Sequence, residues 1–459
     1  MGTRNRTLAK CAIALVGAAC AFCAGGDAGF TEEALRKTPQ GAHKYDAYEP
    51  SERCAMCHKD IAAQFQQSAM ARAQALPWDQ AEYFKLALPH AGREPKVAPV
   101  KAGCINCHAP QAFLAGDIPP AEAGKADPKA DGVSCDMCHS IVGFEGDVPA
   151  NGGFAVSPGK VKHGPRADSK PMLHEARQSD LFKKSELCGV CHNETSPWGA
   201  WVKETQREWA QSPYAKAEIY CLSCHMPPAP GKAATGAPER ADVAQHIFQG
   251  AYSPNMLAGA AQVFIHPLGK EAQAGQRFEI AVTVQNSRAG HRIPTGSAEE
   301  RQLWLRIEAR DAAGKTWHIP ASLAPGDSPE KSYSVTTAKP AYFDLGKIMG
   351  LDDFKGVSRD ALPEGDRLYR KVYLNAEGQE TVAQWYTADT DVFDNRLKPL
   401  EAVVEKYSWD VPAGLAKGEV EIKAVLSYRR LPQSVADLVE IGEVPVVTVA
   451  ADQVTVTAK

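Results

Sequence analysis

Five copies of one pattern, C-x-x-C-H, bring two thiols and an imidazole together at a fixed spacing. One helical turn places the two sulfurs on the same side, and the adjacent histidine can then face the same centre. This is the spacing of c-type haem attachment, in which two cysteines add across the haem vinyl groups and the histidine binds the iron. The copies, called motifs 1 to 5 in chain order, are CAMCH at 54–58, CINCH at 104–108, CDMCH at 135–139, CGVCH at 188–192 and CLSCH at 221–225.

The five motifs predict five covalently bound haem c groups, each with one iron. A single C-x-x-C would be weak, because zinc sites and thiol redox centres use it too. A zinc array and a disulfide framework are the alternatives, but neither needs a histidine after every second cysteine. The predicted haem attachment residues are Cys54, Cys57, Cys104, Cys107, Cys135, Cys138, Cys188, Cys191, Cys221 and Cys224, and the predicted proximal ligands are His58, His108, His139, His192 and His225.

The other three of the 13 cysteines lie in an N-terminal leader. Three basic residues precede an apolar run over residues 11–24, which is too short to span a membrane and has the shape of a signal peptide. We expect a Sec-type signal peptide over 1–24, cleaved within 20–28, and export to the periplasm, with an outer-membrane-associated or extracellular location as variants. A lipid anchor on Cys20 or Cys23 is a weaker alternative. No later segment is long and apolar enough to predict a transmembrane span in the mature chain.

Two regions with different patterns follow the leader. Residues 29–255 hold all five motifs and show weak periodicity, so we expect a haem-dense, mostly α-helical or irregular cytochrome c domain. Residues 256–459 alternate apolar and polar positions, for example over 278–284 and 420–428, which predicts an all-β sandwich. The segment 226–245 is rich in Pro, Gly and Ala and predicts a loop that runs away from motif 5.

A weak internal repeat lies within the motif region. QFQQSAMARA at 64–73 resembles EWAQSPYAKA at 208–217, with an aromatic residue, a serine and an alanine at matching places. The intervals between the first cysteines of successive motifs, 50, 31, 53 and 33 residues, alternate in the same sense. These features hint at an internal duplication; two unrelated amphipathic helices are the alternative.

The second axial ligand decides what each haem does. A His or Met closes the iron for electron transfer, whereas an open position permits substrate binding. Eight histidines lie outside the motifs, enough for mostly bis-histidine ligation. His291 follows a predicted strand and precedes a rigid Pro-Thr-Gly turn that could direct its ring at a haem, and Met70 is either a thioether ligand or core packing. The candidate second ligands are His174, His246, His291, Met70 and His90.

The chain resembles the multihaem (pentahaem) c-type cytochromes that carry a C-terminal immunoglobulin-like β domain. The resemblance implies electron transfer outside the cytoplasm, with His174, His246 and His291 as distal ligands. Relatives often have His where this chain has Met70 and Tyr214, which leaves one sixth ligand open. The matching stretches are GVSCDMCHSIVG (132–143), HGPRADSKPMLH (163–174), LCGVCHNETSP (187–197), EWAQSPYAKAEIYCLSCHMP (208–227), HIFQGAY (246–252), NSRAGHRIPTG (286–296) and DNRLKPLE (394–401).

We therefore expect a protein that relays single electrons between redox partner proteins, with no catalytic residue assigned. The alternative is a multihaem oxidoreductase that acts on a small nitrogen or sulfur compound at one open haem. A third interpretation is a structural subunit of a membrane-associated electron-transfer complex, docked through the sandwich. The net charge of −4 and the lack of a basic, aromatic-rich patch argue against nucleic acid as a partner.

Overall fold

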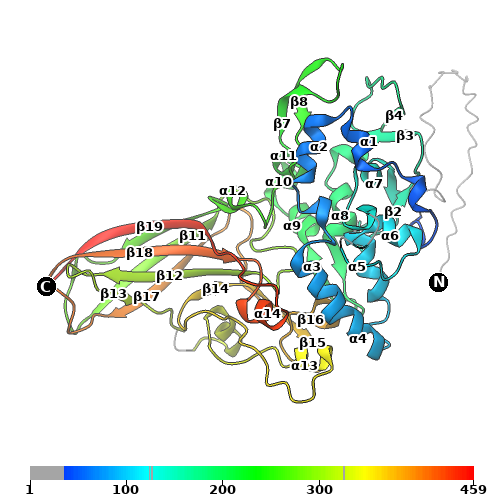
Figure 1. Cartoon of the computed structure of the whole chain (residues 1–459). Helices are drawn as coiled ribbons and strands as arrows, with labels where there is room; N and C mark the ends of the chain where they lie inside the picture. Colours follow the sequence, from blue (N-terminus) through cyan, green and yellow to red (C-terminus); the bar gives the residue numbers. More distant parts are fainter. Residues whose placement is uncertain (1–35, 124, 126–127, 324–325) are drawn as a thin grey trace, which may run out of the picture.

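The computed structural model describes residues 36–459 except 124, 126–127 and 324–325. The predicted signal peptide, with Cys11, Cys20 and Cys23, therefore lies outside the described residues. The described part has an N-terminal helical region and a C-terminal β-rich region, and the β-rich region extends away from the helices to the C-terminus (Figure 1). The predicted change from a motif-bearing helical region to a β region is confirmed.

The helices of the motif region are short. Proline is the first residue of four of the α-helices, at Pro77, Pro110, Pro213 and Pro254, where its missing N–H costs no helical hydrogen bond. Gly116 ends another in the left-handed conformation, with φ of 79°. The helices are α1 (Ser51–Ala55), α2 (Lys59–Gln66), η3 (Met70–Arg72), α3 (Pro77–Ala81), the π-helix η4 (Glu82–Ala87), α4 (Leu88–Arg93), α5 (Val100–His108), α6 (Pro110–Ala115), α7 (Cys135–His139), α8 (Glu186–His192), α9 (Thr205–Ala210), α10 (Pro213–Lys216), α11 (Cys221–His225) and α12 (Pro254–Leu257).

Four two-stranded ribbons join these helices. The predicted loop over 226–245 is wrong in part, because β7 (Pro228–Lys232) and β8 (Glu239–Ala244) pair antiparallel within it. Proline and glycine are tolerated here since the ribbon has two free edges and most of its residues reach solvent. The other ribbons pair β1 (Ile141–Phe144) with β2 (Phe154–Val156), β3 (Val161–Gly164) with β4 (Glu175–Gln178), and β5 (Asn193–Thr195) with β6 (Trp201–Glu204).

The β region contains a six-stranded sheet, a three-stranded sheet and one further ribbon. The larger sheet has the order β10-β19-β18-β12-β13, with β14 also paired to β12, and the smaller has the order β17-β11-β9. The strands of the whole β region are β9 (Ala261–Pro267), β10 (Glu271–Ala272), β11 (Arg277–Asn286), β12 (Gln302–Arg310), β13 (Thr316–His318), β14 (Arg367–Tyr369), β15 (Lys371–Asn375), β16 (Thr387–Asp394), β17 (Ala402–Asp410), β18 (Gly418–Arg429) and β19 (Val447–Ala458). Strands β15 and β16 form the separate ribbon.

Both sheets contribute to one apolar core. Val282 and Val284 of β11 belong to the same buried cluster as Leu305 and Ile307 of β12 and Ile422 of β18. These side chains are fully buried, while the residues between them on β11 are only partly so. The period-2 pattern over 278–284 and 420–428 is thereby confirmed.

A second apolar cluster joins the two regions. Trp78 and Leu86 of the helical region are buried together with Tyr342, Leu345 and Trp385, which follow residue 300 in the chain. Leu345 lies in α13 (Asp344–Met349), and α14 (Gln433–Leu438) adds further members. Side chains from both sides of the predicted domain boundary, between residues 255 and 256, therefore pack together. The position of that boundary stays a prediction.

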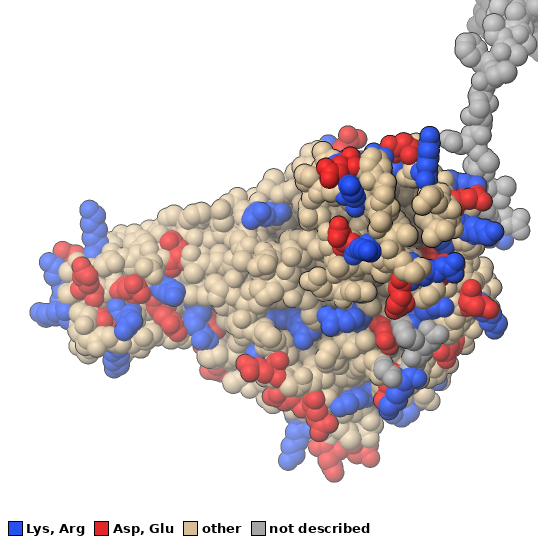
Figure 2. All heavy atoms as spheres, turned by 45° about the horizontal axis from the view of Figure 1, so that its top comes forward, with Lys and Arg blue, Asp and Glu red and all other residues tan. Residues whose placement is uncertain are grey.

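Charges of both signs are interspersed on the face shown in Figure 2. That face has no large area of a single sign, in keeping with the modest net charge of −4. Within the described residues, no helix has the length and apolar character needed to cross a membrane.

Candidate metal centres

Every motif is formed by a helical turn. Motif 1 begins at the end of α1 and ends at His58, directly before α2, while motifs 2 to 5 close α5, α7, α8 and α11 with their histidine as the last helical residue. This geometry places the first cysteine, the second cysteine and the histidine on one face. In the described part of the chain the ten cysteines are not joined in disulfides.

Three motif histidines each face a histidine from outside the motifs. The ring centroids of His139 and His246 lie 6.4 Å apart, with 30° between the planes. The other two pairs have the same spacing: His58 and His174 are 6.3 Å apart, and His225 and His291 are 6.4 Å apart. The structure thus brings together His174, His246 and His291 with motifs 1, 3 and 5.

This spacing fits an iron held between two imidazoles. A metal–nitrogen bond is about 2 Å long and the coordinating nitrogen lies about 1 Å from the ring centre, so two axial rings have centroids about 6 Å apart. The observed 6.3–6.4 Å agrees with that value.

The orientation of the rings also fits iron binding. All six paired histidines use Nδ1 for a hydrogen bond to a main-chain carbonyl, which can only accept, so Nδ1 carries the proton and Nε2 is free for a metal. Such carbonyls are the usual outer partners of metal-bound histidines. The bonds are His58 to Ala233 (2.7 Å), His139 to His163 (2.6 Å), His225 to Gln249 (2.6 Å), His174 to Glu175 (2.9 Å), His246 to Ala244 (3.0 Å) and His291 to Arg292 (2.8 Å).

Burial favours the neutral, metal-binding form of several of these rings. It lowers the pKa of His139 and of His225, and it lowers the pKa of His246 to about 4, with the neighbouring His139 adding to the effect. These imidazoles are therefore neutral at pH 7 and keep a lone pair on Nε2.

The two repeat segments hold distal histidines in the same way. Gln64 and Glu208 occupy the same position in the repeat, each directly before its aromatic residue. Oε1 of Gln64 accepts from the backbone N–H of His246 at 2.9 Å, and Oε2 of Glu208 accepts from the N–H of Arg292, next to His291, at 3.2 Å. This shared role favours the internal duplication over two unrelated helices.

Motif 2 has a different environment. Nδ1 of His108 lies 3.0 Å from the Ala73 carbonyl oxygen and 2.9 Å from Oδ1 of Asp79. Burial lowers the pKa of His108, but the hydrogen bond to the Asp79 carboxylate outweighs it and raises the pKa to about 9. The lining of one cavity includes Cys104, Cys107, His108, Gln74, Asp79 and Glu82.

Motif 4 resembles motif 2 because its histidine has no second histidine opposite it among the described residues. Within residues 36–459, as far as described, no second histidine ring lies at the 6.3–6.4 Å spacing from His108 or His192. Burial, reinforced by the Lys203 ammonium group, lowers the pKa of His192 to about 4, so this imidazole is neutral too. Three of the five motifs therefore have an evident histidine partner and two do not.

Thiol contacts connect the motifs to one another. The Cys54 side chain of motif 1 lies close to Cys135 of motif 3. Cys107 of motif 2 likewise lies close to Cys191 of motif 4, whose other cysteine, Cys188, lies close to Cys221 of motif 5. Cys138 of motif 3 also interacts electrostatically with both cysteines of motif 4. The five motifs thus form one connected group with motif 4 at its centre.

The other candidate ligands lie elsewhere. His90 is buried in α4, where its Nδ1 accepts a 3.2 Å hydrogen bond from Trp385 and its ring contacts Tyr386. Met70 lies half-buried in η3, and its carbonyl accepts from Val133. The ligand roles of both remain predictions.

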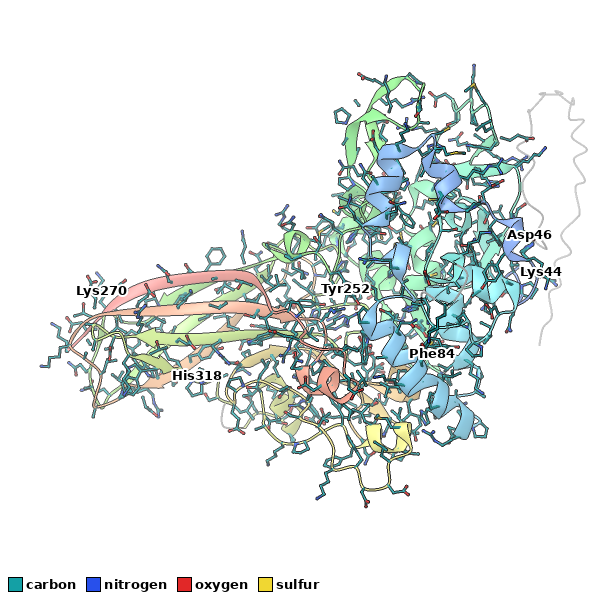
Figure 3. All side chains as sticks on the ribbon, in the orientation of Figure 1. Lys44, Asp46, Phe84, Tyr252, Lys270 and His318 are labelled. Atoms are coloured by element: carbon teal, nitrogen blue, oxygen red, sulfur yellow. The ribbon has the colours of Figure 1, made fainter. Side chains whose placement is uncertain are left out.

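Two of the remaining histidines belong to the β region. Nε2 of His266 lies 3.2 Å from Oγ1 of Thr283 on β11, and His318 is 3.2 Å from Asp366. Figure 3 shows His318 in the β region, away from the motif helices. Both rings therefore have partners in the sheets.

The sequence did not point to the residues that support the motif histidines and the histidines opposite them. The carbonyls of Ala233 and Gln249, the amide of Gln64 and the carboxylates of Asp79 and Glu208 carry no motif of their own. The repeat alignment of Gln64 with Glu208 was the one available signal.

Comparison with known proteins agrees with these centres. The family model described as cytochrome c554 and c-prime matches residues 53–140, which contain motifs 1 to 3. Among curated proteins, none matches the chain significantly.

One solved structure is similar over most of the chain. The penta-heme cytochrome c552 from Thermochromatium tepidum matches with a TM-score of 0.58 and 18% identity, covering 89% of this chain and 99% of the other. At this identity the match shows a shared fold. Spo0M, a sporulation control protein from Bacillus subtilis, matches at 11% identity over 44% of this chain and 50% of its own, but its TM-score of 0.17 carries no argument. The resemblance to multihaem c-type cytochromes is confirmed by the family model and the first structure together.

Proposed function

We propose that this multihaem c-type cytochrome binds five covalent haems and relays single electrons between redox partner proteins. The observation that carries the proposal is the set of three imidazole pairs at 6.3–6.4 Å, each made of one motif histidine and one distant histidine. Bound haem would supply a reversible one-electron couple at each motif. Two closed axial positions favour electron transfer over substrate binding.

The thiol contacts support a relay rather than five isolated centres. Electron transfer falls steeply with distance, so neighbouring haems must be held at close range. The contacts connect motif 1 to motif 3, motif 2 to motif 4 and motif 4 to motif 5, and electrostatic coupling connects motifs 3 and 4. We infer a route from motif 1 through motif 3 to motif 4, which branches to motifs 2 and 5.

The β region belongs to this redox unit in our proposal. Its two sheets share a core, which supports an immunoglobulin-like sandwich. One end of that sandwich presents His291 to motif 5, and the same end is tied to α9 through Glu208. The sheets would therefore supply an axial ligand and fix its direction, in addition to any docking role.

Location and partners are part of the same proposal. The basic and apolar leader over 1–24 supports Sec export, and covalent haem attachment takes place outside the cytoplasm, so we place the mature chain in the periplasm. Its partners would be one electron donor and one electron acceptor, both redox proteins, either free or in a membrane-associated complex.

A second candidate function rests on motifs 2 and 4. No described histidine lies opposite His108 or His192 at the ligand spacing, and His108 lines a cavity with Asp79 and Glu82. An open iron there could reduce or oxidise a small nitrogen or sulfur compound, with carboxyl groups available for proton transfer.

Two measurements test these proposals. The intact mass of the mature protein should exceed the apoprotein by five haems, and a lower increment would reject the pentahaem count. The spectrum should then be recorded with carbon monoxide, cyanide and nitrite. Unchanged low-spin haems support the relay, whereas a high-spin haem that binds these ligands and turns over nitrite supports the enzyme.

A further inference from the structure

Motif 2 differs from motifs 1, 3 and 5 in the group that accepts a hydrogen bond from its motif histidine. Nδ1 of His58, His139 and His225 donates to a neutral main-chain carbonyl. Nδ1 of His108 meets a carbonyl too, but it also lies 2.9 Å from Oδ1 of Asp79. A carboxylate is the stronger acceptor of the two because it bears a full charge.

We propose that Asp79 is a positioning residue that makes the motif 2 iron the most reducing of the five. This inference rests on the proposed pentahaem function. A carboxylate that shares the Nδ1 proton increases the electron density on the imidazole and makes Nε2 a better donor. A better donor stabilises ferric over ferrous iron, so the reduction potential falls.

The surroundings keep this contact strong. The Asp79 side chain is 12% exposed and that of His108 is 27% exposed, so water screens the pair only weakly. The ammonium group of Lys203 opposes the effect, but it is bonded to Glu194 at 2.6 Å. The nearby Glu82 carboxyl is buried, and its Oε1 accepts from Nε2 of Gln384 at 3.3 Å rather than from the His108 ring.

The β-rich region helps to hold Asp79 in place. Asp79 lies in α3, directly after Trp78, which is buried in the cluster shared by the two regions. Nε1 of Trp78 donates to Oε2 of Glu300 at 3.1 Å, just before β12 begins. The position of the carboxylate thus depends on a contact 222 residues away in the chain.

Potentiometric titration of the full-length holoprotein tests the role of Asp79. Asp79→Asn keeps the shape and an acceptor oxygen but removes the charge. We expect the lowest of the five reduction potentials to rise by about 59 mV in Asp79→Asn. For a one-electron couple, this shift changes the ferrous-to-ferric ratio about tenfold at a fixed solution potential. The other four potentials should stay in place, and Asp79→Glu should restore the original value.

Glu82→Gln is the matched control. Glu82 lines the same cavity, but its Oε1 accepts from Gln384 rather than from an imidazole, so its substitution should leave all five potentials in place. Five attached haems in each variant, checked by intact mass, show that folding and maturation are unchanged. Unchanged potentials in an Asp79→Asn protein that keeps five haems would overturn the role of Asp79 and leave the pentahaem proposal standing. An equal shift in Glu82→Gln would do the same. Absence of haem from Cys104 and Cys107 in the unaltered protein would overturn the pentahaem proposal as well.

Discussion

Arg396 donates a 2.6 Å hydrogen bond to Oε1 of Glu208, and the two side chains are only 3% and 7% exposed. The other carboxylate oxygen of Glu208 accepts from Oγ1 of Thr295 at 2.7 Å and from the N–H of Arg292. Glu208 lies in α9, and its partners surround the loop that carries His291. One buried carboxylate therefore fixes the loop of His291, which lies opposite His225 of motif 5, relative to the helical region.

Glu208→Ala should destabilise the protein strongly. It leaves the buried Arg396 guanidinium with one carboxylate, Asp394, in place of two. Removing one partner of a buried ion pair costs about 3–5 kcal/mol, and we expect the lower end here because Asp394 remains. Denaturant unfolding measures the change. Arg277→Ala, which breaks an exposed pair with Asp410, should change stability little, and equal losses in the two variants would contradict the argument.

His291→Ala should convert one low-spin haem to high spin while five haems stay attached, because motif 5 then lacks its second imidazole. Electron paramagnetic resonance and intact mass measure these two properties, and exogenous imidazole should reverse the spin change. His266→Ala, in a β9 residue bonded to Thr283, is the control and should change neither property. The same number of low-spin haems in His291→Ala as in the unaltered protein would limit the sheets to packing and docking.

The shared core makes a point variant preferable to a shortened chain. A chain ending near residue 258 would lose Tyr342, Leu345 and Trp385, which are buried against Trp78 and Leu86. Any spectral change in such a protein could follow from the exposed apolar surface rather than from the missing ligand.

His174→Ala and His246→Ala should each produce one high-spin haem, at motif 1 and motif 3 respectively. The two histidines face different motif histidines, so their effects should add in the double variant to give two high-spin haems. Quantitative electron paramagnetic resonance counts the high-spin irons. A double variant with a single high-spin haem would mean that only one of the two is a ligand.

The sequence predicts which histidines lie together better than it predicts the residues around them. The C-x-x-C-H spacing locates the five helical turns, and His174, His246 and His291 do lie opposite motif histidines. The β7–β8 ribbon was missed because its proline and glycine residues resemble those of a loop, although Ala233 within it accepts from His58, 175 residues away. Local patterns carry no signal for partners that only tertiary folding brings together.

The same reasoning explains the unexpected second core. Each segment around Trp78, Leu345 and Trp385 is too short to show a clear period, so no sequence pattern indicated that they pack together. The alternating strands of the β region, by contrast, reveal their buried face over ten or more residues, as in β11 and β18.

Met70 can be assigned by a redox titration. A Met ligand raises the potential of a haem relative to bis-histidine ligation, so one haem should lie well above the others if Met70 binds iron. Met70→His should then lower that potential. Met70→Leu, which keeps the volume but removes the sulfur, should yield a high-spin haem. If Met70 only packs against its neighbours, Met70→Leu leaves every potential and spin state unchanged.

Asp344 should make stability depend on pH. Burial raises the pKa of this carboxyl to about 7 in the folded protein, where neither of its oxygens has a hydrogen-bond partner among the described residues; nearby Thr381 and Asn375 partly offset the shift. The carboxyl ionises more easily when unfolded, so its contribution is fully present below about pH 4 and is lost as pH rises to about 7, at about 1.4 kcal/mol per pH unit. Asp344→Asn cannot ionise, and its unfolding free energy should fall less between pH 5 and pH 8 than that of the unaltered protein. Comparing the two proteins by denaturant unfolding cancels the titration of the histidines they share. Parallel pH profiles would show that Asp344 is already ionised in the folded state at pH 5.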